Sequence, residues 1–298
     1  MKTTIRTHYN PCFWTSYWNF DYLNRKRLNP ELKENVRKKE VFVLNLKSDK
    51  IFIDVTQNVF YKKKLGLATI TKEGALDFTK RNFPNELENI QNRYKKDKSE
   101  LTLDFENYFT LMEESYRIHL EELILNDKAI TINEKAYLTF FVLFQALRNP
   151  NSLDDMTELY KANGLEKFEL LVSIRHKISD YNGLAELSAP FSVPTWNIYK
   201  LKKNIFPLSD NPVLAKNGHI MVAISPNIML ELDLKEKCKE VNPVHIKTRI
   251  SYLKKKEFIK RTILNSSREI IFGEERVLQK IKKSRIYKKH LERIKNAC

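Results

Sequence analysis

The sequence predicts an α+β fold: an antiparallel sheet formed by an N-terminal hairpin and later strands, with a central helical insertion and basic C-terminal helices. Three patterns predict this class: a β-branched hairpin near the start, a long stretch with helical spacing, and short apolar runs between turn residues. There is no internal repeat or low-complexity linker in the sequence. We therefore expect one domain with four regions, residues 1–71, 72–189, 190–234 and 235–298.

The N-terminal region is rich in aromatic side chains. Seven of them fall between Tyr9 and Tyr22, including Trp14 and Trp18. A cluster of this density is expected either to pack in the interior or to bind a ligand. After it, residues 41–46 and 51–55 flank a polar turn at residues 47–50, and their β-branched content predicts a β-hairpin.

The middle of the chain has helical spacing. From Lys72 to Ala185, apolar residues recur every three or four positions, and the run from Ala136 to Leu147 predicts a buried core helix that ends before Pro150. This run, the longest apolar one, is shorter than the roughly 20 residues that cross a bilayer. Because the first residues also lack the apolar core of a signal peptide, we expect a cytoplasmic protein without membrane association.

The pattern then changes to strands, expected at residues 196–201, 212–215, 220–224 and 228–232. Asn217-Gly218 and Ser225-Pro226-Asn227 supply turn residues between them. Beyond them, two amphipathic helices are predicted, over about 251–272 and about 274–295, with Gly273 between them.

The positive charge is concentrated at the C-terminal end. The chain has a formal net charge of +16, of which residues 1–234 carry +3 and residues 235–298 carry +13. On the second predicted helix, a spacing of about 100° per residue gathers four cations on one face, Lys282, Arg285, Lys289 and Arg293. Such a row can be a solvated surface or can follow a phosphate backbone. The first predicted helix adds Lys254, Lys255 and Arg261.

Motifs for cofactors and metals are not found. The three cysteines, Cys12, Cys238 and Cys298, are far apart, and none of the six glycines falls in a phosphate-binding motif. His119 and His176 lie in helical segments without a metal-ligand spacing. The sequence thus assigns no metal site and leaves any cofactor unknown.

Two short motifs carry a family resemblance. His8-Tyr-Asn-Pro11, followed by Phe13, and Ser209-Asp-Asn-Pro212 resemble the landmarks of a bacterial family of domains of unknown function that has an N-terminal His-x-x-Pro signature. The sequence departs from that family at Cys12, where Gln is usual, and near Lys260, where Asn is common. The resemblance implies a shared fold and no defined activity.

Three residues are the candidates for catalysis. His8, on a turn fixed by Pro11, is suited to acid/base chemistry or to a structural contact with a backbone carbonyl. Asp210 is expected to orient His8, to ligate a metal or to cap a turn, and Arg148 to hold a phosphate or to cap helix carbonyls. The sequence leaves these interpretations open for each residue.

These observations lead to two hypotheses about function. In the first, the protein binds RNA or DNA through its basic helices, with Trp14 and Trp18 stacking on bases where they are exposed, and His8 leaves open a nuclease-like hydrolase of a defence or toxin type. In the second, it is a non-enzymatic interaction domain whose basic tail docks on an acidic protein partner.

Overall fold

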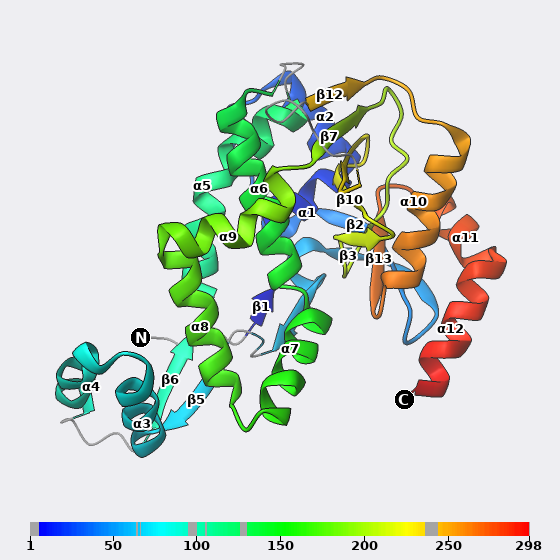
Figure 1. The fold of residues 1–298 in the computed structure, drawn as a ribbon. Helices are drawn as coiled ribbons and strands as arrows, with labels where there is room; N and C mark the ends of the chain where they lie inside the picture. The colour runs from blue at the N-terminus through cyan, green and yellow to red at the C-terminus, as the bar shows by residue number, and fades with distance from the viewer. Residues whose placement is uncertain are drawn as a thin grey trace. The chain divides into compact units, whose positions relative to one another are not determined.

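The computed structural model describes residues 6–63, 65, 67–94, 100–104, 106–125, 130–235 and 244–297. The chain divides into two compact units. The major unit comprises His8–Tyr61, Glu113–Asn149 and Ser188–Cys298, and the minor unit comprises Lys62–Met112 and Pro150–Leu187 with the N-terminal residues up to Thr7. The α+β class predicted from the sequence is confirmed (Figure 1).

The larger sheet of the major unit has the strand order β12-β7-β11-β10-β9. Its strands are β7 (Thr195–Lys200), β9 (Leu214–Lys216), β10 (His219–Ser225), β11 (Ile228–Asp233) and β12 (Val244–Lys247). All neighbours are antiparallel except β12 and β7, which run parallel. Asn217 and Gly218 turn the chain from β9 to β10 with positive φ angles of 52° and 78°, as the Asn-Gly pair predicted.

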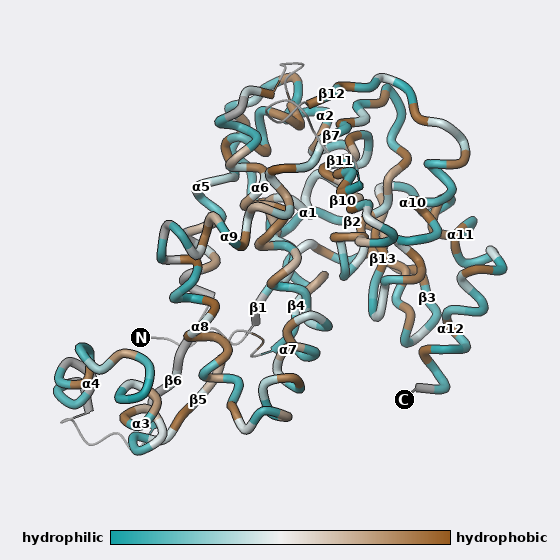
Figure 2. The backbone as a smooth tube through the Cα atoms, in the orientation of Figure 1, coloured by the Kyte–Doolittle hydropathy of each residue, from teal (hydrophilic) through white to brown (hydrophobic). Residues whose placement is uncertain are grey.

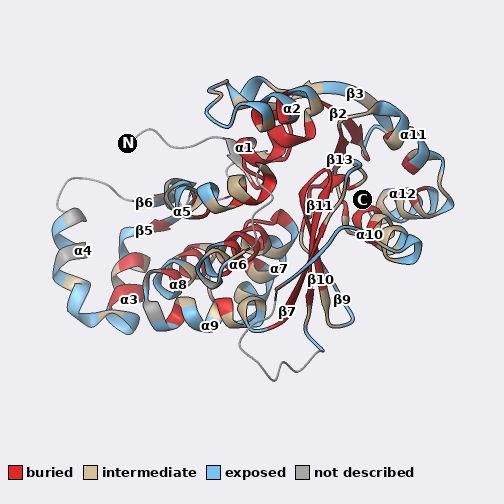
Figure 3. Cartoon of the chain, turned by 90° about the horizontal axis from the view of Figure 1, so that it is seen from above, coloured by how far each residue is buried: buried red, intermediate tan, exposed pale blue. Residues whose placement is uncertain are grey.

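Helices cover both faces of this sheet (Figure 3). On one face, Lys135 of α6 (Ile132–Leu147) lies over the Trp196 ring of β7 at 5.3 Å. On the other, Lys254 of α10 (Tyr252–Asn265) contacts Tyr199 of β7 and Glu231 of β11. The predicted core helix over 136–147 is therefore present, and its buried side chains pack in the interior.

The predicted hairpin belongs to a second sheet. Its strands, β2 (Glu40–Asn45) and β3 (Lys50–Val55), lie in the order β3-β2-β13-β8 with β13 (Glu269–Phe272) and β8 (Leu208–Ser209). The early hairpin thus joins later strands, as expected, but the main later strands form a separate sheet. The two sheets are separate because β2 pairs with β13, more than 200 residues away in the sequence. Local sequence patterns do not encode a pairing of this kind.

The C-terminal helices differ from the prediction at two points. The helix expected over 251–272 ends at Asn265, because Glu269–Phe272 pairs with β2 and β8 as strand β13. The helix expected over 274–295 is broken at Ser284, whose ψ angle of 144° is extended. It forms α11 (Glu275–Lys283) and α12 (Arg285–Ala297), and α12 is largely hydrophilic (Figure 2).

The N-terminal segment buries most of its aromatic side chains. It consists of β1 (Arg6–His8), α1 (Cys12–Thr15), the 3₁₀ turn η1 (Ser16–Trp18) and α2 (Phe20–Leu28). The exposed fraction of Trp14 and of Trp18 is 0%, and their indole N–H groups donate to the carbonyls of Ile224 and Phe206. These two rings were expected to stack on bases only where they are exposed, and that condition is not met, because neither ring is accessible.

The minor unit is mainly helical. An antiparallel pair of strands, β5 (Leu67–Thr71) and β6 (Glu100–Asp104), accompanies its helices. The helix predicted from the spacing of apolar residues is therefore wrong at Leu103, which lies in β6. The remaining elements of the chain are the strand β4 (Tyr61–Lys63), the 3₁₀ turns η2 (Val36–Lys38), η3 (Thr56–Asn58) and η4 (Pro84–Glu86), and the helices α3 (Lys72–Asn82), α4 (Leu87–Tyr94), α5 (Glu106–Leu125), α7 (Pro150–Ala162), α8 (Lys167–Ser179) and α9 (Tyr181–Ser192). None of the described helices has both the length and the hydropathy of a transmembrane segment.

Buried polar groups join the two motifs that carried the family resemblance. The side-chain amide of Asn10 donates to the carbonyl of Ser209 at 3.0 Å, and that of Asn149 donates to the carbonyl of Asp210 at 3.1 Å. The buried Asp210 carboxylate accepts hydrogen bonds from the Ser267 hydroxyl at 2.6 Å and from the Arg268 amide at 2.9 Å. It thereby fixes the segment that leads from α10 into β13.

This arrangement predicts a stability defect in an Asp210→Ala variant. Removing the carboxylate leaves the amides of Ser267 and Arg268 without their acceptor, at a cost of about 3 kcal/mol in the free energy of unfolding. Urea denaturation followed by tryptophan fluorescence measures it, because all three tryptophans lie in the major unit. The exposed Asp21→Ala in α2 is the matched control, expected to cost less than about 1 kcal/mol. Equal losses in the two variants would refute the structural role of Asp210.

A second carboxyl in this region predicts a pH effect. Burial raises the pKa of Glu269, and the charge of Asp210 raises it further, against the opposing effects of the Phe60 amide and Arg268. The folded state then holds this proton more tightly than the unfolded chain, so the stabilisation is complete below the unfolded pKa and is lost as pH rises through the folded pKa.

In Glu269→Gln, the amide oxygen can still accept from the Phe60 amide, which lies 3.0 Å from the native carboxylate. We therefore expect the variant to gain stability relative to the wild type between about pH 4 and pH 8. Urea midpoints of both proteins across this range measure the difference. Parallel pH profiles would contradict the prediction.

Candidate cationic groove

A groove of about 1230 Å³ lies in the major unit at the end of β7. Five parts of the chain enclose it: the C-terminal turn of α2, the C-terminal turn of α5, the segment from β7 through residue 205, the turn between β10 and β11, and the segment from β12 into α10. All of these residues belong to the major unit. The groove is therefore a feature of one unit.

Asn227 holds two of these parts together. Its side-chain oxygen accepts a hydrogen bond from the Arg27 guanidinium at 2.7 Å, and its side-chain amide donates to the carbonyl of Leu201 at 2.8 Å. The backbone amide of Leu201 donates in turn to the carbonyl of Asn227. The Ser-Pro-Asn turn predicted from the sequence thus positions Arg27 against the chain that leaves β7.

The charged residues that line the groove are all cations. They are Arg27, Lys200, Lys202, Lys203, Arg249 and Lys255, and no acidic residue lines it among the residues that the structure describes. Apolar side chains, including Ile124 and Ile198, form part of the wall. Six cations without an acidic residue among the described lining make the groove attractive to an anion.

The first predicted basic helix contributes one of its three candidates to this site. Lys255 lines the groove, whereas Lys254 lies 2.6 Å from the Glu231 carboxylate and 2.8 Å from the Tyr199 hydroxyl. Burial lowers the pKa of Lys254, but the hydrogen bonds to Glu231 and Tyr199 outweigh it and raise the pKa above its ordinary value. Arg261 is buried and pairs with Glu257, so it presents no surface to a phosphate.

The second predicted basic helix keeps three of its four candidates on the surface. Arg285, Lys289 and Arg293 are exposed and lie four residues apart on α12, which places them on one face. Lys282 lies on α11, beyond the break at Ser284, and pairs with Asp49 at 3.5 Å. The predicted row of four cations is therefore a row of three.

The three catalytic candidates have structural contacts. The Nε2 atom of His8 lies 2.9 Å from the carbonyl oxygen of Gln57, which is the structural alternative that the sequence left open. The exposed fraction of Arg148 is 1%, and its guanidinium pairs with Glu113 on α5, so it does not offer a phosphate clamp. Asp210 directs its carboxylate to Ser267 and Arg268 rather than to a solvent-exposed cleft. Burial raises the pKa of Asp210 despite these hydrogen bonds.

Sequence analysis missed five of the six groove cations. Arg27, Lys200, Lys202, Lys203 and Arg249 lie outside the predicted basic helices and come from separate regions of the chain. One local signal was present, because three lysines fall within the four residues from Lys200 to Lys203. The rest of the cluster depends on how the sheet ends are brought together.

Comparisons with known proteins do not place this chain in a family. No family model matches it, and no match was found among curated proteins or among solved structures. The family resemblance of the two sequence motifs therefore stays a prediction. The cationic groove is the feature of the structure on which a functional proposal can be based.

Proposed function

We propose that the protein binds nucleic acid, and that the cationic groove of the major unit holds the sugar–phosphate backbone. The observation that carries the proposal is the grouping of six cations, without an acidic residue among its described lining, in one groove of about 1230 Å³. Lys and Arg side chains bind phosphates by direct charge pairing and by releasing condensed counterions. A surface of this kind suits a polyanion.

An exposed aromatic side chain lies close in sequence to the groove lining. Tyr252 is 75% exposed and stands at the start of α10, between the lining residues Ile250 and Lys255. Its ring is available for stacking on an unpaired base, the role that buried Trp14 and Trp18 do not fill. In the proposal, the groove cations supply the affinity and Tyr252 supplies a base contact.

The row on α12 provides a matched control for the groove. Lys202, Lys203 and Arg249 are exposed residues of the groove, and Arg285, Lys289 and Arg293 are exposed residues of α12. Reversing either set to Glu changes the net charge by the same amount. The two triple variants therefore separate a specific groove from a general attraction of a basic protein to polyanions.

We expect the triple groove variant to lose at least about 100-fold in affinity for nucleic acid near physiological salt, and the α12 variant to lose less than about tenfold. Fluorescence anisotropy with labelled RNA and DNA of mixed sequence, single- and double-stranded, measures both. The dependence of the wild-type affinity on salt concentration should become shallower in the groove variant.

Two outcomes would contradict this function. Equal losses in the two variants would show that net charge, and not the groove, determines binding. Competition by polyglutamate as effective as competition by unlabelled nucleic acid would favour the alternative, an acidic protein partner. Tryptophan fluorescence of each variant checks that the major unit is folded, since all three tryptophan rings are buried there.

A further inference from the structure

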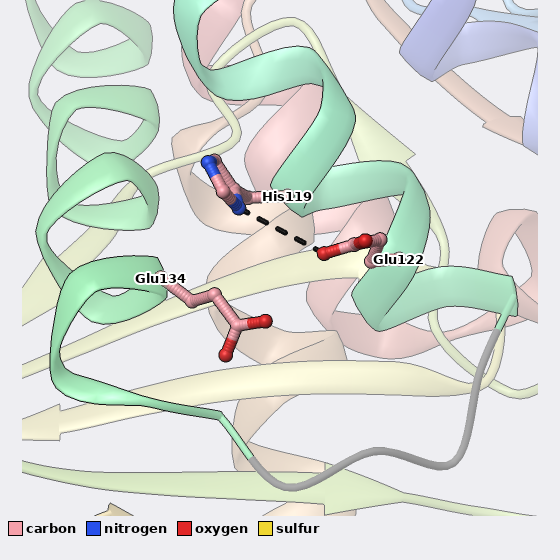
Figure 4. Close-up of side chains that lie close together, drawn as sticks. All are labelled: His119, Glu122 and Glu134. Carbon is pink, nitrogen blue, oxygen red and sulfur yellow. Dashed lines mark ion pairs between the residues drawn. The ribbon is translucent and has the colours of Figure 1, made fainter.

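A cluster of potential metal ligands lies between α5 and α6 of the major unit. His119 and Glu122, three residues apart on α5, share one face of that helix. Glu134 is in the first turn of α6 and points toward them (Figure 4). His119 does not belong to a metal-binding motif within one helix, because the third potential ligand comes from the next helix.

Packing between the two helices sets this meeting point. Tyr116 of α5 contacts Phe141 of α6, and one turn further along α5 His119 stacks on Tyr137. The partners on α6 move toward its N-terminus as the positions on α5 move toward its C-terminus, so the helices are antiparallel. The next turn brings Glu122 to Glu134.

The ligand atoms are close enough to share one ion. One atom from each of the three side chains lies within 4.8 Å of the others, and His119 Nδ1 is 3.8 Å from Glu122 Oε2. Ligands of a tetrahedral zinc ion stand about 3.3 Å apart, given bonds of about 2.0–2.1 Å. Side-chain movements of at most about 1.5 Å would close the site around the ion.

A second observation points to a ligand. His119 Nδ1 is buried and has no hydrogen-bond partner among the described residues, and the Glu122 oxygen is too distant to serve as one. The imidazole is oriented by Tyr137, whose ring stacks on it at 4.2 Å with an interplanar angle of 19°. A metal ion would supply the partner that this nitrogen lacks.

The chemistry of the donors selects the kind of ion. One imidazole nitrogen and two carboxylates suit zinc or another divalent ion of the first transition series, whereas calcium and magnesium prefer oxygen ligands throughout. The two carboxylates match the charge of such an ion. Glu134 is held in place by its capping box with Thr131, and the three side chains are only partly buried, which leaves room for water as a further ligand.

We propose that His119, Glu122 and Glu134 bind one divalent transition-metal ion. The site stands beside the cationic groove on α5, because Leu123 to Leu125, which follow Glu122, line that groove. The proposal rests on the three ligands and does not depend on nucleic-acid binding.

Titration calorimetry with Co²⁺ and with Mn²⁺ on the metal-depleted protein tests it. We expect one ion per chain, and a loss of affinity of at least about tenfold in His119→Ala and in Glu122→Gln. Glu134→Gln removes a charge while keeping a residue that suits the third position of a capping box. The exposed His245→Ala is the control, expected to bind as the wild type does.

The cobalt absorption spectrum identifies the ligands independently. Nitrogen and oxygen ligands give weak visible bands, whereas binding to any of the three cysteines would add an intense thiolate band in the near ultraviolet. Undiminished affinity in His119→Ala, an equal loss in His245→Ala, a thiolate band or a lack of binding would each overturn the proposal.

The metal-binding proposal and the nucleic-acid-binding proposal can be tested independently. In the presence of a chelator, Glu122→Gln should bind nucleic acid as tightly as the wild type does. The triple groove variant should retain the metal ion. Loss of metal binding in His119→Ala with nucleic-acid affinity intact supports the metal site alone.

Discussion

The burial of the N-terminal aromatic segment is the constraint on which the major unit depends. Trp14 donates its indole N–H to Ile224 of the larger sheet, whereas Asn10 donates to Ser209 of the smaller sheet. The same short segment therefore supplies polar contacts to both sheets while its rings fill the space beside them. Large buried rings contribute several kcal/mol each, and their N–H groups must find acceptors in the interior. Geometry at one sheet is thereby coupled to geometry at the other through residues 9–20.

Local patterns predicted the elements whose partners are near in sequence. The hairpin over 41–55 and the strands around Asn217-Gly218 are set by β-branched residues and turn chemistry, and both are present. The error over Glu269–Phe272 has the opposite origin. This segment pairs with Phe42–Asn45, more than 200 residues away, and that pairing overrides the helical spacing of its apolar residues. The break at Ser284 was missed because the apolar spacing continues across it into α12.

The same distinction explains the candidate sites. Sequence analysis found the cations of the C-terminal region, but charge is neutralised by contacts across the chain: Lys254 by Glu231, and Lys282 by Asp49. The groove draws its cations from several segments, of which only residues 200–203 are dense in lysine. His119 likewise lacked a metal motif, because the antiparallel packing of α5 on α6, and not spacing within one helix, brings Glu134 to it.

The net charge of a segment of the chain therefore does not tell where positive charge gathers on the folded surface. Residues 1–234 carry +3 and residues 235–298 carry +13, yet four of the six groove cations come from the nearly neutral part of the chain. Within that part, Arg27 and Lys200–Lys203 gather at one end of the larger sheet, where no acidic residue is among the described lining of the groove. A phosphate backbone responds to the local field, since charges farther apart than about 10 Å are largely screened in salt. In the proposed function, the folding of the sheet ends, more than the basic C-terminal region, therefore determines where the polyanion is held.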